Sequence, residues 1–168
     1  MQTTDTAYLF LQLVMRKLRR FSGKGTRARC AIIVPDGVLF GTGVGSRVRK
    51  LLLENFNLKT ILRLPHGIFA PYTNITTNIL FFESGGPTKE IWFYEHRLPV
   101  DSKSYTKTRP IQYEEFLPFL DWWNHRTENE HAWAVSREKI AADDYSLDLR
   151  RSKDEEESFD TSEDLLED

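Results

Sequence analysis

The chain has 168 residues, of which 40 % are hydrophobic and 29 % charged, and its formal net charge is −2. These values are typical of one soluble globular domain that can bury a core, and no apolar stretch reaches the roughly 18–20 residues of a membrane span. One cysteine, Cys30, and four scattered histidines exclude an internal disulfide and argue against a zinc site. Because no signal peptide is visible either, we expect a cytoplasmic protein.

The first part of the chain predicts alternating helices and strands. Apolar residues at helical spacing predict a helix over residues 5–20, with basic side chains near its C-terminal end. The continuous apolar run 29–34 predicts a strand covered on both faces, as in a parallel sheet. Residues 47–56 predict a second helix and residues 60–64 a second strand. Together these elements predict a βαβ unit, which is almost always right-handed.

Shorter elements follow. Residues 78–83 and 90–95 predict two further strands, and their short connections favour antiparallel neighbours. Residues 113–123 predict an aromatic-rich helical segment that Pro118 interrupts. Residues 131–136 predict a short strand that leads into a capped turn.

These elements suggest three regions. We expect an α/β core over residues 1–98, an extension over 99–150, and an acidic tail over 151–168 that is disordered without a partner. A complete doubly wound nucleotide-binding domain begins with a strand and a glycine turn, whereas this chain begins with a helix. We therefore expect a sheet that lacks one edge, and such an edge favours self-association.

A glycine loop, 41–46, lies between a predicted strand and a predicted helix. Backbone N–H groups at a helix start attract anions, so the loop could contact DNA phosphate or cradle a cofactor. Its G-x-G-x-G spacing differs from the dinucleotide fingerprint, and Arg63 stands where an acidic residue would end the next strand. We favour a structural turn, and the two phosphate-binding interpretations stay open.

A second loop, 65–78, follows the strand that ends near residue 64 and displays Phe69 and Tyr72. Aromatic side chains at a strand's C-terminal edge can hold a planar ligand or stack on an extruded base. Phe69 can equally pack the loop onto the core, and the residues favour neither interpretation. Asp36 belongs to the same edge, where a turn-stabilising role is the simpler interpretation. No Ser/His/Asp, Cys/His or paired-carboxylate arrangement is evident.

Charge is distributed unevenly along the chain. Residues 1–50 contain ten Lys and Arg against two acids, whereas residues 151–168 contain two against nine. The basic part can face nucleic acid, with Arg47, Arg49 and Lys50 as candidate phosphate contacts. The alternative is a set of solvated helix faces with a solubilising tail.

Several phrases in order resemble one family over about residues 5–150. They are AYLFLQLVMRKLR, RCAIIVPDGVLF, GSRVRKLLLENFNLKTILRLPHGIF, NITTNILFFE and HAWAVSREKIAADDYSLDL. This series is similar to the later half of the modification subunit of type I restriction-modification systems. That family comprises adenine-N6 DNA methyltransferases that use S-adenosyl-L-methionine.

The resemblance implies an α/β fold, the second half of a Rossmann-like methyltransferase sheet (helix, βαβ unit, then antiparallel strands) with a small C-terminal extension. It implies DNA, a specificity subunit and a restriction subunit as partners, and it places Phe69 where related enzymes stack a Phe on the flipped adenine. The family's glycine-rich cofactor motif and its Asn-Pro-Pro-Phe/Tyr motif are absent from the sequence.

Because these motifs are absent, no catalytic or cofactor-binding residue is assigned. We expect this portion alone to be inactive. The alternative is a non-enzymatic nucleic-acid-binding or subunit-interaction module.

Overall fold

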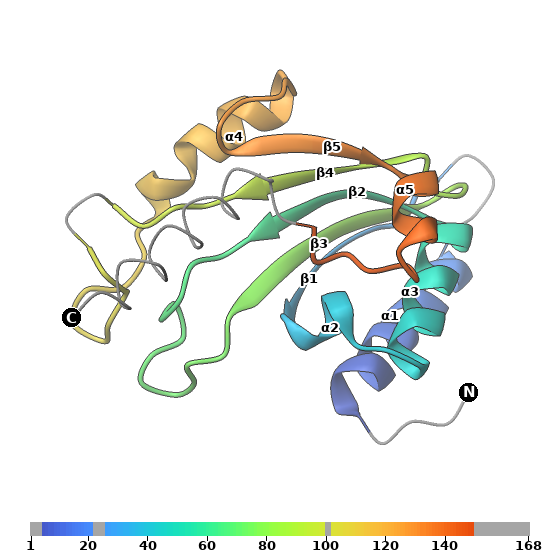
Figure 1. The fold of residues 1–168 in the computed structure, drawn as a ribbon, viewed down its shortest axis with the longest axis horizontal. Coiled ribbons are helices and arrows are strands. Elements are labelled where there is room, and N and C mark those ends of the chain that lie inside the picture. Colours follow the sequence, from blue (N-terminus) through green and yellow to red (C-terminus); the bar gives the residue numbers. More distant parts are fainter. Residues whose placement is uncertain (1–4, 22–25, 100–101, 150–168) are drawn as a thin grey trace, which may run out of the picture.

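The computed structural model describes residues 5–21, 26–99 and 102–149, which form a five-stranded sheet packed against helices (Figure 1). The acidic tail and its predicted disorder lie outside the described residues. The elements are α1 (Thr6–Phe21), β1 (Arg29–Pro35), α2 (Gly37–Phe40), α3 (Val44–Asn55), β2 (Phe56–Arg63), β3 (Thr77–Ser84), β4 (Glu90–Glu95), the 3-10 helix η1 (Tyr113–Phe116), α4 (Leu117–Asn124), β5 (Ala132–Ser136) and α5 (Arg137–Ala142).

The strand order is β1-β3-β2-β4-β5. β3 lies between β1 and β2 and is antiparallel to both, so β1 and β2 run in the same direction with α3 in their connection. The α/β class and the helical crossover are therefore confirmed, although β1 and β2 are not neighbours. The expectation that β3 and β4 are antiparallel neighbours is wrong, because β4 pairs in parallel with β2 and antiparallel with β5.

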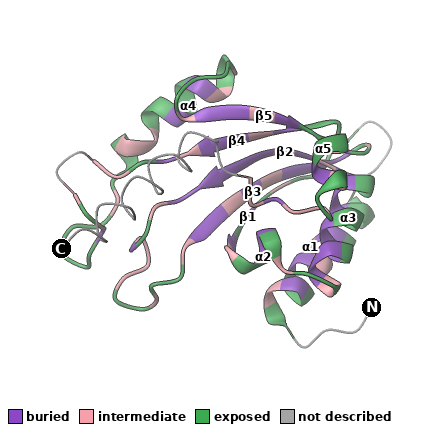
Figure 2. Ribbon diagram, in the orientation of Figure 1, coloured by how far each residue is buried: buried purple, intermediate pink, exposed green. Residues whose placement is uncertain are grey.

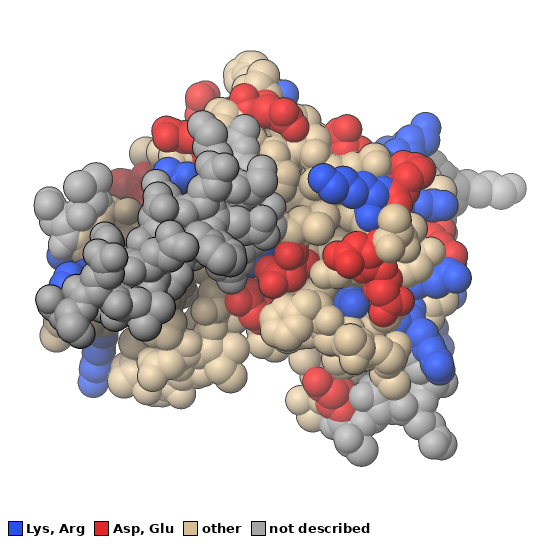
Figure 3. Space-filling view, viewed as in Figure 1, with Lys and Arg blue, Asp and Glu red and all other residues tan. Residues whose placement is uncertain are grey.

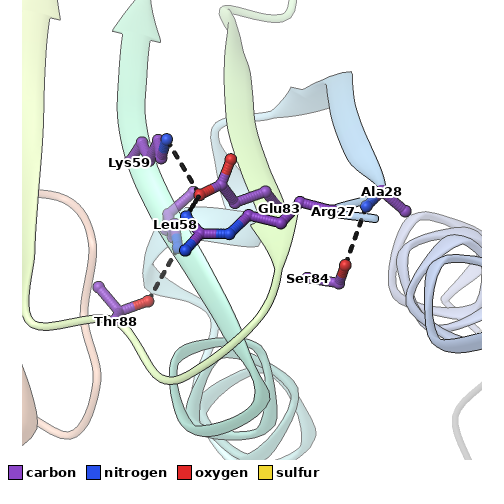
Figure 4. Close-up of polar contacts among 7 residues, drawn as sticks. All are labelled: Arg27, Ala28, Leu58, Lys59, Glu83, Ser84 and Thr88. Atoms are coloured by element: carbon purple, nitrogen blue, oxygen red, sulfur yellow. Dashed lines mark hydrogen bonds and ion pairs between the residues drawn. The ribbon is translucent and has the colours of Figure 1, made fainter. Parts of the chain in front are cut away.

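Thr88 explains how a short connection reaches the far side of β2. The Thr88 hydroxyl donates to the Phe56 carbonyl (2.8 Å) and accepts from the Leu58 amide (2.9 Å), while its own amide donates to the Leu53 carbonyl (2.8 Å). Figure 4 shows Thr88 beside the start of β2. The connection thus passes over the amino end of β2 and delivers β4 to the edge of β2 that β3 leaves open.

The main core lies between one face of the sheet and α1, α3 and α5 (Figures 1 and 2). α1 contributes four buried side chains at three- and four-residue spacing, which is the pattern of an amphipathic helix. A second, aromatic cluster fills the other face under α4, where Tyr94 contacts Phe119 and Trp122. Pro118 occupies the first turn of α4 and so begins this helix instead of interrupting it.

The outer part of β1 is less covered than expected. Ile32 and Val34 are buried, but Ile33 on the opposite face is 52 % exposed, so the prediction of a strand covered on both faces is wrong for the described residues. Within those residues, the second edge of β1 pairs with no strand. An apolar groove of about 330 Å³ runs between α1 and β1, with the exposed Phe10 and Phe21 at its side.

The predicted extension over 99–150 supplies β5, the edge strand beside β4. The core and the extension, which the sequence separates near residue 98, therefore share one sheet. Ser136 caps α5 by accepting a hydrogen bond from the Lys139 amide (3.3 Å). No helix of the described residues is long and apolar enough to cross a membrane.

Candidate nucleic-acid interface

The loop between β2 and β3 lies at the edge of the sheet where β1, β2 and β4 all end (Figure 1). Ligand sites of α/β proteins commonly form beyond the carboxyl ends of such parallel strands. A cavity of about 320 Å³ opens at this edge, and Asp36, Arg63 and His66 are among its lining residues. The sequence-predicted Phe69 and Asp36 thus belong to one edge of the fold.

Phe69 is half-buried and belongs to neither buried hydrophobic cluster, whereas the adjacent Ile68 packs against the aromatic one. The Phe69 carbonyl accepts hydrogen bonds from the amides of Tyr72 (2.9 Å) and Thr73 (3.2 Å), which form a tight turn. Tyr72 itself is 90 % exposed. Ile68 therefore anchors the loop, and Phe69 as a residue remains partly accessible.

Gly67 fixes the first half of this loop against the segment 102–110. Its φ of +85° favours glycine, and a Cβ atom at this position would lie 2.7 Å from the Tyr105 carbonyl oxygen. The Tyr105 hydroxyl donates to Glu115 and lies 3.3 Å from His96 Nε2. Burial, and then the hydrogen bond to Glu115, raise the pKa of Tyr105, while burial lowers the pKa of His96. The loop thus rests on a polar network, with a neutral tyrosine at its centre, that sequence reasoning missed.

Asp36 has a different role from the local turn that its position favours. It precedes α2 but makes no side-chain cap hydrogen bond there. Its Oδ1 accepts a 2.6 Å hydrogen bond from Nδ2 of Asn78, at the start of β3. The carboxylate therefore connects two strands at the base of the loop.

The glycine loop is a structural turn packed against α1 and α3. A Cβ atom at Gly41 or at Gly45 would collide with the hydroxyl of Tyr8, which donates to the Gly37 carbonyl (2.9 Å). Gly43 has a φ of +63°. The residues present therefore do not fit a cofactor cradle, because protein atoms fill the space in front of this loop.

Arg49 is 1 % exposed and points into the protein. Its guanidinium donates to the carbonyls of Val38 (3.1 Å), Gly41 (2.8 Å) and Tyr145 (2.6 Å). Burial lowers the pKa of Arg49, and the nearby Tyr8 and Asp144 offset only part of this lowering. Arg49 as a phosphate contact is thus a wrong prediction, because its guanidinium is turned inward and binds these three backbone carbonyls.

Arg47 and Lys50 are exposed on α3 and stay candidate phosphate contacts. Lys50 Nζ lies 3.9 Å from Glu54 and 5.7 Å from the centre of the Tyr145 ring. Figure 3 shows basic side chains mixed with acidic ones on the right of the view, where Figure 1 places α3. The described residues contain no group of three or more His, Cys, Asp or Glu that could hold a metal.

Comparisons with known proteins identify the family. The N-6 DNA methylase family model matches residues 1–161. The chain belongs to this family. It is 48 % identical over 157 residues to the type I restriction enzyme EcoEI methylase subunit of Escherichia coli, covering 89 % of this chain and 31 % of that protein. It is 32 % identical to the EcoKI methylase subunit of Escherichia coli K12, and this match covers 83 % of this chain and 28 % of that protein.

Solved structures agree with these relatives. A modification subunit of a putative type I restriction enzyme from Vibrio vulnificus superposes with a TM-score of 0.80 at 50 % identity, over 83 % of this chain and 29 % of that one. A chain from a study of type I restriction-modification assembly gives a TM-score of 0.81 at 34 % identity, over 99 % and 40 %. The resemblance to N-6 DNA methylase modification subunits is confirmed, and the chain spans less than half the length of each of these relatives.

Proposed function

We propose that this segment is part of the modification subunit of a type I restriction-modification system, which methylates adenine N6 in DNA. One observation carries the proposal beyond family membership. The loop between β2 and β3 presents a half-buried Phe69 at the carboxyl edge of the sheet. An enzyme that modifies a base must extrude it from the duplex and commonly stacks it on such a ring.

In this proposal Phe69 supplies an apolar face for the extruded adenine, and Ile68 and Gly67 hold the loop that carries it. Arg47 and Lys50 contact backbone phosphates, which adds affinity without sequence preference. A specificity subunit reads the target sequence and a restriction subunit completes the assembly. The protein is cytoplasmic.

S-adenosyl-L-methionine supplies the methyl group in the intact methylase. We expect its binding residues in parts of the methylase that this segment lacks, since the glycine loop is filled by Tyr8 and Arg49. The isolated 168 residues are therefore expected to bind it negligibly and to be inactive. Calorimetry checks this expectation, and saturable low-micromolar binding would contradict it.

The edge of β1 that pairs with no strand among the described residues, and the exposed apolar side of α1, favour attachment of further chain. In the intact methylase we expect the remainder of the sheet to cover this surface, because unpaired edges and apolar grooves associate readily. In the isolated segment the same surface favours self-association.

The proposed function is tested on the methylase that contains this segment, assembled with its specificity subunit. The assay follows transfer of a labelled methyl group from S-adenosyl-L-methionine to adenine in unmethylated DNA. Incorporation into N6-methyladenine supports the proposal. DNA binding without any incorporation would favour the non-enzymatic module.

A further inference from the structure

Three segments meet at the base of the loop that carries Phe69. The loop leaves β2 and returns to β3, and its ends are joined by a hydrogen bond from the Leu64 amide to the Thr77 carbonyl (3.2 Å). A second bond comes from another part of the chain, since the Asp36 amide donates to the Thr76 carbonyl (3.0 Å). The residue that follows β1 therefore holds the loop where it enters β3.

The side chain of Asp36 adds a second connection. Asn78 is 0 % exposed, and its Nδ2 donates to Asp36 Oδ1 at 2.6 Å. Its own Oδ1 is buried and has no hydrogen-bond partner among the described residues. Losing the bond to Asp36 would therefore leave both ends of this amide buried without a partner in that part of the chain.

The position of Asn78 makes this bond relevant to the loop. In register, Asn78 lies opposite Val34 of β1 on one side and opposite Arg63 of β2 on the other. It is therefore the point at which the ends of both parallel strands meet the start of β3. A shift of the backbone at Asn78 would therefore move the end of the loop that carries Phe69.

We propose that Asp36 and Asn78 are a positioning pair that sets the Phe69 loop for stacking on the extruded base. This inference rests on the proposed function. Asn78 is 0 % exposed and does not touch the base, and Asp36 acts on the loop through its hydrogen bond to Asn78. The pair acts by keeping the loop in one place, so that the ring is already oriented when the base arrives. A displacement of about 1 Å in a reacting geometry can cost on the order of 100-fold in rate.

The test compares Asp36→Ala and Asp36→Asn in the methylase that contains this segment. Asp121→Ala, an exposed site on α4, is the matched control. Hydrogen exchange is measured for the amides of Leu64 and Tyr72, and methyl transfer to unmethylated DNA gives kcat and KM. Asparagine at position 36 keeps an acceptor for Asn78, whereas alanine removes it.

For Asp36→Ala we expect about tenfold faster exchange in the loop and a kcat about tenfold lower, with KM for DNA changed less than about threefold. Asp36→Asn and Asp121→Ala are expected to stay close to the unsubstituted protein. Unchanged loop exchange in Asp36→Ala, or an Asp36→Asn protein as impaired as Asp36→Ala, would overturn the proposal. An unsubstituted methylase without methyl transfer would refute the proposed function instead, and loop exchange would still report on the pair.

Discussion

Replacing Arg49 tests whether its side chain belongs to the core, as the structure shows, or contacts phosphate, as the sequence suggested. Replacing it with alanine removes three hydrogen bonds, to the carbonyls of Val38, Gly41 and Tyr145, at a site that is 1 % exposed. A buried acceptor that loses its partner costs about 1 kcal/mol or more, so we expect a loss of roughly 3–4 kcal/mol in the free energy of unfolding.

The same helix offers matched controls. Arg47 and Lys50 are exposed, so Arg47→Ala and Lys50→Ala are expected to change the free energy of unfolding by less than about 0.5 kcal/mol. Urea unfolding followed by tryptophan fluorescence measures all three variants on the 168-residue chain. An Arg49→Ala protein as stable as these controls would refute the assignment of Arg49 to the core.

Three further predictions concern separate parts of the molecule. Phe69→Ala in the methylase is expected to weaken binding of the extruded base by roughly 1–3 kcal/mol while Phe69→Tyr retains most of it. Fluorescence of 2-aminopurine at the target position measures this, and a fall in melting temperature alone would make Phe69 structural. Burial would raise the pKa of Glu83, but the hydrogen bonds and charges of Lys59 and Arg27 outweigh it and hold that pKa below its usual value (Figure 4). The stability from this carboxylate is present above its ordinary pKa of 4.5 and is lost as the pH falls through the lowered value. Urea midpoints measured from about pH 6 down to about pH 3 should therefore decline less in Glu83→Gln. Light scattering on the isolated segment should show self-association that Phe10→Glu weakens, and a stable monomer at high concentration would contradict this.

Four of the five strands could be predicted from the sequence because apolar runs and their breaks locate them, whereas β2 begins at Phe56, within the helix expected over residues 47–56. β1, β3 and β4 end within one residue of the predicted bounds. Their order could not be predicted, since an apolar run does not specify its neighbour. The insertion of β3 depends on backbone pairing with two strands at once.

Only part of the candidate site could be predicted from the sequence. The loop and Phe69 follow from a strand that ends at a proline, but the interior position of Arg49 does not, because Tyr145, one of its partners, lies far along the chain. Asn78 did carry a signal, since an amide within the apolar run of β3 must find a partner. That signal does not identify Asp36, because the pairing depends on the strand order.

The place of β3 has a consequence for how the chain assembles during synthesis. β1 and β2 are made first, but they flank a space one strand wide, since neighbouring strands lie about 4.8 Å apart. A growing chain that has not yet released Thr77–Ser84 therefore holds two apolar strands whose facing edges lack a partner. Such edges pair readily with other chains. A nascent chain is consequently exposed to aggregation between completion of β2 at Arg63 and synthesis of β3 at Thr77–Ser84.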